Sequence, residues 1–250
     1  MKNINLIMLA LIIACASNLL LKSNAEESES SFEDLLNSTT KSIFEKKEEK
    51  KEIVESGQIK FKVKKQNLWF KDKLGKTEKL SDFIELSLPG KLYNPPRGIQ
   101  TIERKEDVDR STLENAISSI FSANKSGNLN WIVENFVDSD QGKIKKIFQN
   151  KKLLEESKLD AERIISIYIT GQVDYKDSTI VLIEQKYIDG RKAKESMACK
   201  KTEKGWKVTN EFSADKNFDI VFAALSYGEI TMKDKKLPEN EKPSKIQEKS

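Results

Sequence analysis

The chain has 250 residues, of which 34% are charged and 37% apolar, so it is more charged and less apolar than an average soluble domain. Its 44 basic and 40 acidic residues leave a formal net charge of +4, which is too small and too evenly mixed for a dedicated nucleic-acid-binding protein. It contains no histidine, which excludes Ser-His-Asp and Cys-His catalysis and histidine-based metal sites. With two cysteines it has neither a cysteine-rich metal cluster nor a disulfide framework, so the sequence indicates no metal and no cofactor.

The first 25 residues have the pattern of an export signal. A short basic start precedes a nearly continuous apolar run at 4–16, which is too short for a comfortable membrane span. Two processing routes are open. Ser23-Asn24-Ala25 fits ordinary signal-peptidase cleavage, whereas Ile12-Ile13-Ala14-Cys15 resembles a bacterial lipobox in which Cys15 is acylated. These routes, and the alternative of an uncleaved anchor helix, all predict a protein of the bacterial cell envelope, in the periplasm or at the outer membrane.

Residues 26–56 are predicted to form one amphipathic helix. Ser30 and Glu33 make a capping box, and Gly57 offers a helix stop. An apolar stripe follows at three- and four-residue steps and includes Phe32, Leu35, Leu36, Ile43 and Phe44. Such a stripe packs on its own domain, lies in a partner's groove or forms a short coiled coil. We therefore treat the stripe as a candidate partner-binding surface.

A small β-containing extension is expected next, between the helix and residue 110. Residues 58–64 alternate strictly between apolar residues and lysines, which is typical of a strand with one solvated face. The lysine face is also a weak candidate for contact with an anionic surface. Residues 103–110 form a charged linker, so the sequence predicts a domain boundary there and a second domain at 111–230.

The second domain begins with a helical pattern. Ser111 and Glu114 make a capping box before a stripe that ends near Gly127, and two further helices are indicated by apolar spacing at 129–136 and 144–154. Asp138, Asp140 and Gln141 lack calcium-loop spacing and are interpreted as a loop.

The apolar period then changes from 3.6 to 2. Four predicted strands cover 165–173, 179–187, 193–201 and 206–213, and Asp189-Gly190 is a strong hairpin signal. Four consecutive strands with tight turns predict an antiparallel meander. Cys199 is interpreted as a small apolar residue within this sheet. A last helix contains Phe218 and Phe222, which we also consider for partner binding, and residues 231–250 are predicted to be a disordered tail.

This order of elements resembles the NTF2-like (SnoaL-like) family. The likeness is carried by the helix pair around Lys125-Ser126-Gly127-Asn128-Leu129, the strands from Ile164, and Lys204-Gly205-Trp206-Lys207-Val208 at the last strand. It covers about half of the chain. The resemblance implies an α+β fold in which helices pack on a curved four-stranded meander, preceded here by the N-terminal helix and the small β segment. It concerns fold and not function.

The resemblance also implies an alternative function. Family enzymes place an Asp/His pair or an Asp/Tyr set inside the cone, and the missing histidine removes the first version here. A ligand pocket built on a desolvated carboxylate would serve a small-molecule binder or a lyase/isomerase. Its candidate lining residues are Trp131, Tyr168, Glu184, Tyr187 and Trp206. Against this, Glu184 is flanked by polar residues on an alternating strand and is equally typical of a half-exposed face.

No catalytic constellation is recognisable, so we assign no catalytic residues. The leading hypothesis is a non-enzymatic envelope protein that binds or assembles through protein–protein contact, with another envelope protein or a second copy as its partner and no nucleic acid. A small-molecule-binding domain is the alternative, and a purely structural lipoprotein held by Cys15 is the third.

Overall fold

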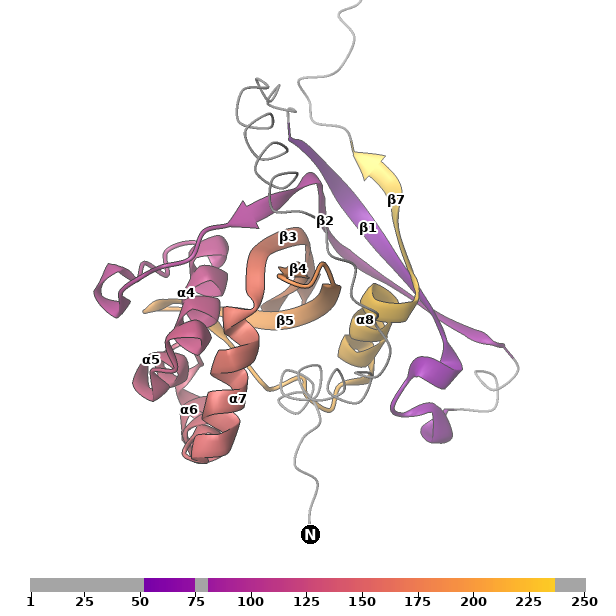
Figure 1. Cartoon of the computed structure of the whole chain (residues 1–250). Helices are drawn as coiled ribbons and strands as arrows, with labels where there is room; N and C mark the ends of the chain where they lie inside the picture. Colours follow the sequence, from indigo (N-terminus) through magenta and orange to yellow (C-terminus); the bar gives the residue numbers. More distant parts are fainter. Residues whose placement is uncertain (1–51, 75–80, 237–250) are drawn as a thin grey trace, which may run out of the picture.

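The computed structural model describes residues 52–74 and 81–236. The predicted export signal, most of the predicted N-terminal helix and residues 237–250 lie outside the described residues. Figure 1 shows an α+β molecule in which α4–α7 gather on one side of the sheet and α8 lies on the other. The α+β class predicted from the sequence is therefore confirmed.

Five α-helices are described, and local capping sets their ends. They are α4 (Leu113–Ser126), α5 (Leu129–Glu134), α6 (Asp138–Phe148), α7 (Lys151–Glu162) and α8 (Lys216–Tyr227). The hydroxyl of Thr112 accepts the backbone N–H of Asn115, so Thr112 caps α4 and the predicted cap at Ser111 is wrong. Gly127 closes α4 in the left-handed conformation, with φ 67°.

Two other helix predictions are corrected. The single helix expected across 144–154 is divided into α6 and α7, because the side chain of Asn150 accepts the backbone N–H of Lys152 and starts a new helix. The Asp138–Gln141 stretch is the first turn of α6 and not a loop. Its two aspartates suit that position, since carboxylates are favourable at a helix N-terminus.

The strands form one seven-stranded sheet in the order β6-β5-β4-β3-β2-β1-β7. They are β1 (Ile53–Lys64), β2 (Phe83–Ile99), β3 (Ile164–Tyr175), β4 (Ser178–Tyr187), β5 (Lys192–Thr202), β6 (Gly205–Val208) and β7 (Glu229–Lys236). The predicted antiparallel meander is confirmed as β3-β4-β5-β6. The sheet has seven strands and not four, and β6 ends at Val208, earlier than predicted.

Both ends of the described chain differ from the sequence prediction. Residues 53–56 belong to β1, so the helix predicted to reach residue 56 is wrong over this stretch. Residues 231–236 belong to β7, where disorder was expected. In both places a strand far along the sequence supplies hydrogen bonds: Ile53 pairs with Asn94 on β2, and Ile230 pairs with Phe61 on β1. Such pairing is invisible to local composition.

Strand β2 joins the two parts of the sheet. Its first half pairs with β1 and its second half with β3, and Gly90 pairs on both sides, with Gly57 and with Val173. The sheet therefore continues across the charged segment 103–110, where a domain boundary was expected.

Two apolar cores lie on opposite faces of this sheet. The first lies between α4–α7 and the sheet and includes the buried side chains Ile117, Trp131, Ile144, Ile169, Ile183 and Cys199. The second lies against α8 and includes Ile59, Phe61, Leu68, Leu182, Phe218 and Val221. Strand β4 serves both, because Val181 and Ile183 face the first core whereas Ile180 and Leu182 face the second. Cys199 is thus a buried apolar residue of the first core, as predicted.

Candidate functional site

The five residues considered for a ligand pocket lie on both faces of the sheet. Trp131 is buried in the first core, where its indole N–H donates to the Ser119 hydroxyl at 2.9 Å. Trp206 packs against the same core, and Tyr187 lies on that face of β4. Glu184 and Tyr168 pair directly across β3 and β4 on the opposite face. The structure therefore does not bring the five side chains together.

Glu184 has ordinary surroundings for a strand carboxylate. Its carboxylate lies 3.4 Å from the Lys192 ammonium group, and the Lys186 ammonium group lies 4.8 Å from the centre of the Tyr168 ring. These contacts agree with the alternative that Glu184 sits on a charged, partly exposed face.

The candidate partner-binding residues likewise lie in different surroundings. Phe218 is buried and stacks on Phe212 with the ring centres 6.5 Å apart, so its side chain belongs to the second core. Phe222 is half-buried on the same helix. Cys15 and the stripe residues Phe32, Leu35, Leu36, Ile43 and Phe44 lie outside the described residues.

A chain of polar side chains lies beneath α7 on the first-core face. The Gln185 amide contacts the Glu195 carboxylate on the neighbouring strand. The Tyr187 hydroxyl lies 2.9 Å from the Gln185 amide oxygen and 3.2 Å from a carboxylate oxygen of Asp160 on α7. We call Glu195, Gln185, Tyr187 and Asp160 the polar chain. It places two carboxylates at the ends of one hydrogen-bonded array.

Burial sets the charge state of this array. Loss of hydration, reinforced by the nearby Asp160 carboxylate, raises the pKa of Glu195 to about 7, although the hydrogen bond from Gln185 opposes the shift. A carboxyl group with such a pKa can accept or release a proton near neutral pH.

Sequence reasoning missed Glu195, although the sequence contained a signal for it. Glu195 shares its strand face with Met197 and Cys199, both of which are buried in the first core. A charged residue in register with two core residues is uncommon, because an unpaired buried charge costs several kcal/mol. Glu184 was considered because it lies in the middle of a strand, but the alternation along β4 places it on the other face of the sheet.

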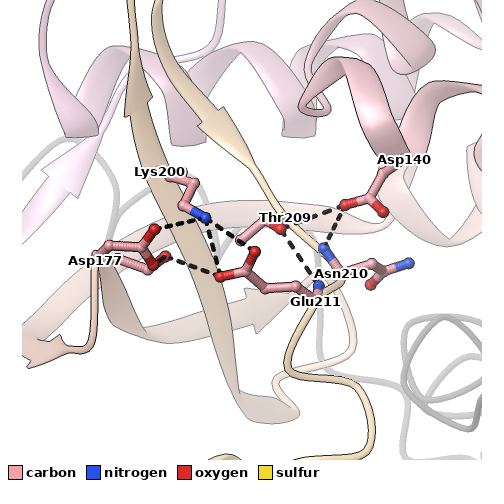
Figure 2. Close-up of polar contacts among 7 residues, drawn as sticks. Asp140, Asp177, Lys200, Thr209, Asn210 and Glu211 are labelled. Carbon is pink, nitrogen blue, oxygen red and sulfur yellow. Dashed lines mark hydrogen bonds and ion pairs between the residues drawn. The ribbon is translucent and has the colours of Figure 1, made fainter.

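A second polar network holds the segment that follows β6. Figure 2 shows the Lys200 ammonium group between the Asp177 carboxylate, at 2.8 Å, and the Glu211 carboxylate, at 2.9 Å. The buried Asp140 carboxylate accepts the backbone N–H of Asn210 at 2.7 Å and the Thr209 hydroxyl at 3.3 Å. All of these polar groups are paired within the network, so its role is to fix the chain between β6 and α8.

Three exposed aliphatic residues lie near the junction at which α7 ends, β3 begins and β4 ends. Leu159, Ile165 and Ile188 are 52%, 64% and 72% exposed, and we call these three residues the apolar corner. The backbone N–H of Ile188 donates to the carbonyl of Arg163 at 2.9 Å, which ties the β4–β5 turn to the end of α7. Exposed aliphatic side chains at one junction are candidates for contact with another molecule.

An open depression adjoins the corner. It has a volume of about 300 Å³ and is lined by Ile99, Gln100, Thr101 and residues 164–167, so Ile165 belongs to both features. The described chain also begins close to this depression. Glu52 forms an ion pair with Arg97, which stands two residues before Ile99 on β2. The first described residue, Glu52, therefore lies near this depression.

Among the described residues, no group of three or more acidic, cysteine or histidine side chains could hold a metal ion. Within the same residues, no helix combines the length and apolar character needed to cross a membrane.

The chain has few matches among known proteins. No protein-family model matches the chain, and no curated protein matches it significantly. Among solved structures, a crystal structure from Campylobacter jejuni described as an NTF2-like transpeptidase is similar over 40% of this chain and 100% of that one. The identity is 14% and the TM-score 0.32, which is too low to establish a shared fold.

Proposed function

We propose that this chain is a non-enzymatic binding and assembly protein of the bacterial cell envelope that acts through protein–protein contact. The observation that carries the proposal is the apolar corner with its adjoining depression, because large exposed aliphatic side chains near one edge are candidates for contact with another molecule. The envelope location rests on the export pattern of residues 1–25.

The partner is a second copy of the chain, and the predicted stripe of residues 32–44 supplies the contact. Phe44 stands eight positions before Glu52, which the ion pair with Arg97 holds next to the depression. Eight residues span about 12 Å as a helix and about 26 Å when extended, so the stripe can reach a neighbouring molecule that lies against the corner. An amphipathic helix that contacts a partner through its apolar stripe is a common recognition mode.

Helices α4–α7 and the meander β3–β6 form an NTF2-like unit in this proposal. Support comes from the left-handed Gly127 between α4 and α5, and from the Gly205-Trp206-Lys207-Val208 entry, which forms β6. Both features are among those on which the sequence resemblance rests.

Site-specific photo-cross-linking tests the assembly role. A photoreactive residue at position 188 of the processed chain should cross-link to residues 32–44 of a second copy. The same residue at position 227 is the matched control, since Tyr227 is 69% exposed at the end of α8 and is not one of the corner residues. Sedimentation should show a concentration-dependent dimer that Ile165→Asp with Ile188→Asp abolishes. A chain that remains monomeric, or that cross-links equally from both positions, contradicts the proposal.

A second candidate function, acid–base chemistry on a small molecule, is favoured by Glu195 alone. The Glu195 carboxyl group, which has a pKa of about 7 and is linked through the Gln185 amide to the Tyr187 hydroxyl, has the properties of a general base. Small ligands that raise the melting temperature of the chain should lose this effect in Glu195→Gln and keep it in Glu184→Gln, which alters the opposite face. Equal loss in both variants would argue against a site at Glu195.

A further inference from the structure

The end of the β1–β2 hairpin carries a feature that the proposed function does not use. The chain leaves β1 at Lys64, forms two short 3-10 turns at Lys65–Asn67 and Lys71–Lys73, and re-enters the sheet at Phe83. Figure 1 shows these turns, in purple, beside α8 and away from α4–α7. This end of the molecule therefore lies far from the apolar corner.

The turns are held rigidly by their own apolar residues. Leu68, Phe70 and Leu74 are buried in the second core against α8. The backbone N–H of Trp69 donates to the Asp219 carboxylate on α8 at 3.2 Å. The positions between these anchors consequently face outward in a defined arrangement.

Two aromatic side chains point outward from this end. Trp69 is 44% exposed and Phe83 is 38% exposed. A lysine lies over each ring, with the Lys73 ammonium group 5.8 Å from the Trp69 ring centre and the Lys62 ammonium group 4.8 Å from that of Phe83. Exposed aromatic rings next to lysines are the side chains that membrane interfaces favour, because the ring enters the headgroup region while the ammonium group stays in water.

The surrounding charge is strongly positive. Five lysines surround the two rings without an ion pair to any described residue, namely Lys64, Lys65, Lys71, Lys73 and Lys216. The acidic side chains of the described turn are Asp72 and Asp82. This excess is local, because the formal net charge of the entire chain is only +4. Clusters of four to eight basic residues are typical of surfaces that bind anionic lipids.

A depression of about 500 Å³ lies within the same surface. It is lined by Lys64, Lys65, Gln66, Ser81, Asp82 and Phe83. The two lysines beside an aromatic ring offer hydrogen-bond donors to a phosphate and an apolar wall to the glycerol and upper acyl carbons, whereas the Ser81 hydroxyl already donates to the Phe83 carbonyl.

We propose that the hairpin end, defined by Trp69, Phe83 and the five lysines named above, docks the protein on an anionic phospholipid membrane. Charge complementarity attracts the surface to the membrane, and the two rings then insert at headgroup depth. An acidic protein would satisfy the lysines but would leave the exposed rings without a role, so the membrane explains more of the surface. This docking is independent of acylation at Cys15 and of the contact at the apolar corner.

Vesicle co-sedimentation tests the proposal with the chain from residue 26 onward, which lacks Cys15. Vesicles with about one third phosphatidylglycerol should bind at least about tenfold more tightly than vesicles of phosphatidylcholine alone, and raising the salt from about 0.05 M to about 0.3 M should weaken this binding. Lys71→Glu with Lys73→Glu should reduce the affinity at least about tenfold. The matched control is Lys145→Glu with Lys146→Glu, two exposed lysines on α6 that carry the same change of charge.

Trp69 supplies a second readout. Brominated phosphatidylglycerol should quench the tryptophan fluorescence of the wild type, and Trp69→Ala should remove that quenching while Trp131 and Trp206 still report the folded state. Three results would overturn the proposal: equal binding to both vesicle types, equal loss in the two lysine variants, or tighter binding to a soluble polyglutamate than to the anionic vesicles. Since the apolar corner is intact in these variants, dimer formation separates failure here from failure of the assembly role.

Discussion

At the residue scale, Glu195 is an ionisable side chain in apolar surroundings. It is a carboxyl group facing an apolar core, and its hydrogen-bonded partner Gln185 is itself buried. The Tyr187 hydroxyl has one hydrogen for two acceptors, the Gln185 amide oxygen and the Asp160 carboxylate. A proton on Glu195 completes the array once the Gln185 amide is oriented to suit. The polar chain is therefore best satisfied when Glu195 is protonated.

This predicts that stability depends on pH through Glu195. The pKa of this group is about 7 in the folded chain against 4.5 without burial, so between these values the folded state binds a proton that the unfolded state releases. The free energy of unfolding therefore falls as the pH rises through this window, by about 3–4 kcal/mol at 1.4 kcal/mol per pKa unit. Glu195→Gln should match the wild type near pH 4 and exceed its stability near pH 8.

Urea denaturation across that pH range measures the difference between variant and wild type. Glu184→Gln is the control, because Glu184 is paired with Lys192 on the opposite face. A difference between Glu195→Gln and the wild type that does not change with pH would show that Glu195 is ionised in the folded chain throughout the window.

At the scale of elements, β2 is the strand on which the sheet depends. Gly90 lies between β1 and β3, and a Cβ there would stand 2.8 Å from Cδ1 of Ile59 and closer still to the backbone oxygen of Gln172. Glycine is thus needed for the close approach of three strands.

Gly90→Ala should consequently destabilise the chain by about 1–3 kcal/mol or more, because the backbone of β3 must move. Gly142→Ala is the matched control. Its Cβ would meet no atom within 4 Å on α6, so we expect stabilisation by about 0.5–1 kcal/mol from helix propensity. Thermal unfolding followed by circular dichroism measures both, and an equal effect of the two changes would refute the crowding argument.

The packing of strand β7 on the second core should also contribute to stability. Ile230 and Met232 pair with Phe61 and Ile59 and pack against the second core, whereas Thr231 between them is exposed. Replacing Ile230 and Met232 together by Ala should cost about 2–3 kcal/mol of unfolding free energy, from the partly buried apolar area that is lost. Thr231→Ala should change it little. Equal losses would mean that β7 does not pack on the core.

At the scale of the whole molecule, one sheet connects the two cores. Strand β2 pairs with both β1 and β3, and the two faces of β4 serve the two cores. A core that shares its central strands with another cannot unfold alone without exposing the other core.

We therefore predict a single cooperative unfolding transition. Phe61→Ala in the second core and Ile144→Ala in the first should each reduce the free energy of unfolding by about 2–5 kcal/mol. Each change should therefore lower the midpoint of that same transition. Far-ultraviolet circular dichroism and tryptophan fluorescence should give coincident curves. Two separated transitions would instead support an independent unit on each side of residues 103–110.

The sequence by itself determined the features that depend on neighbouring residues. The alternation at 58–64 placed Ile59, Phe61 and Val63 on one buried face, and the Asp189-Gly190 turn fixed the hairpin between β4 and β5. Periodicity succeeds in such places because the pleat of a strand and the pitch of a helix are local properties.

Only the tertiary structure decided which faces are covered and where the edge strands lie. Residues 53–56 and 231–236 are strands because β1 and β2 supply hydrogen bonds from far along the chain. Likewise Glu195 faces a core whereas Glu184 does not, because α7 packs on one side of the sheet and leaves Glu184 on the other. Alternation states that two residues share a face, but the elements that cover that face are set by contacts between distant segments.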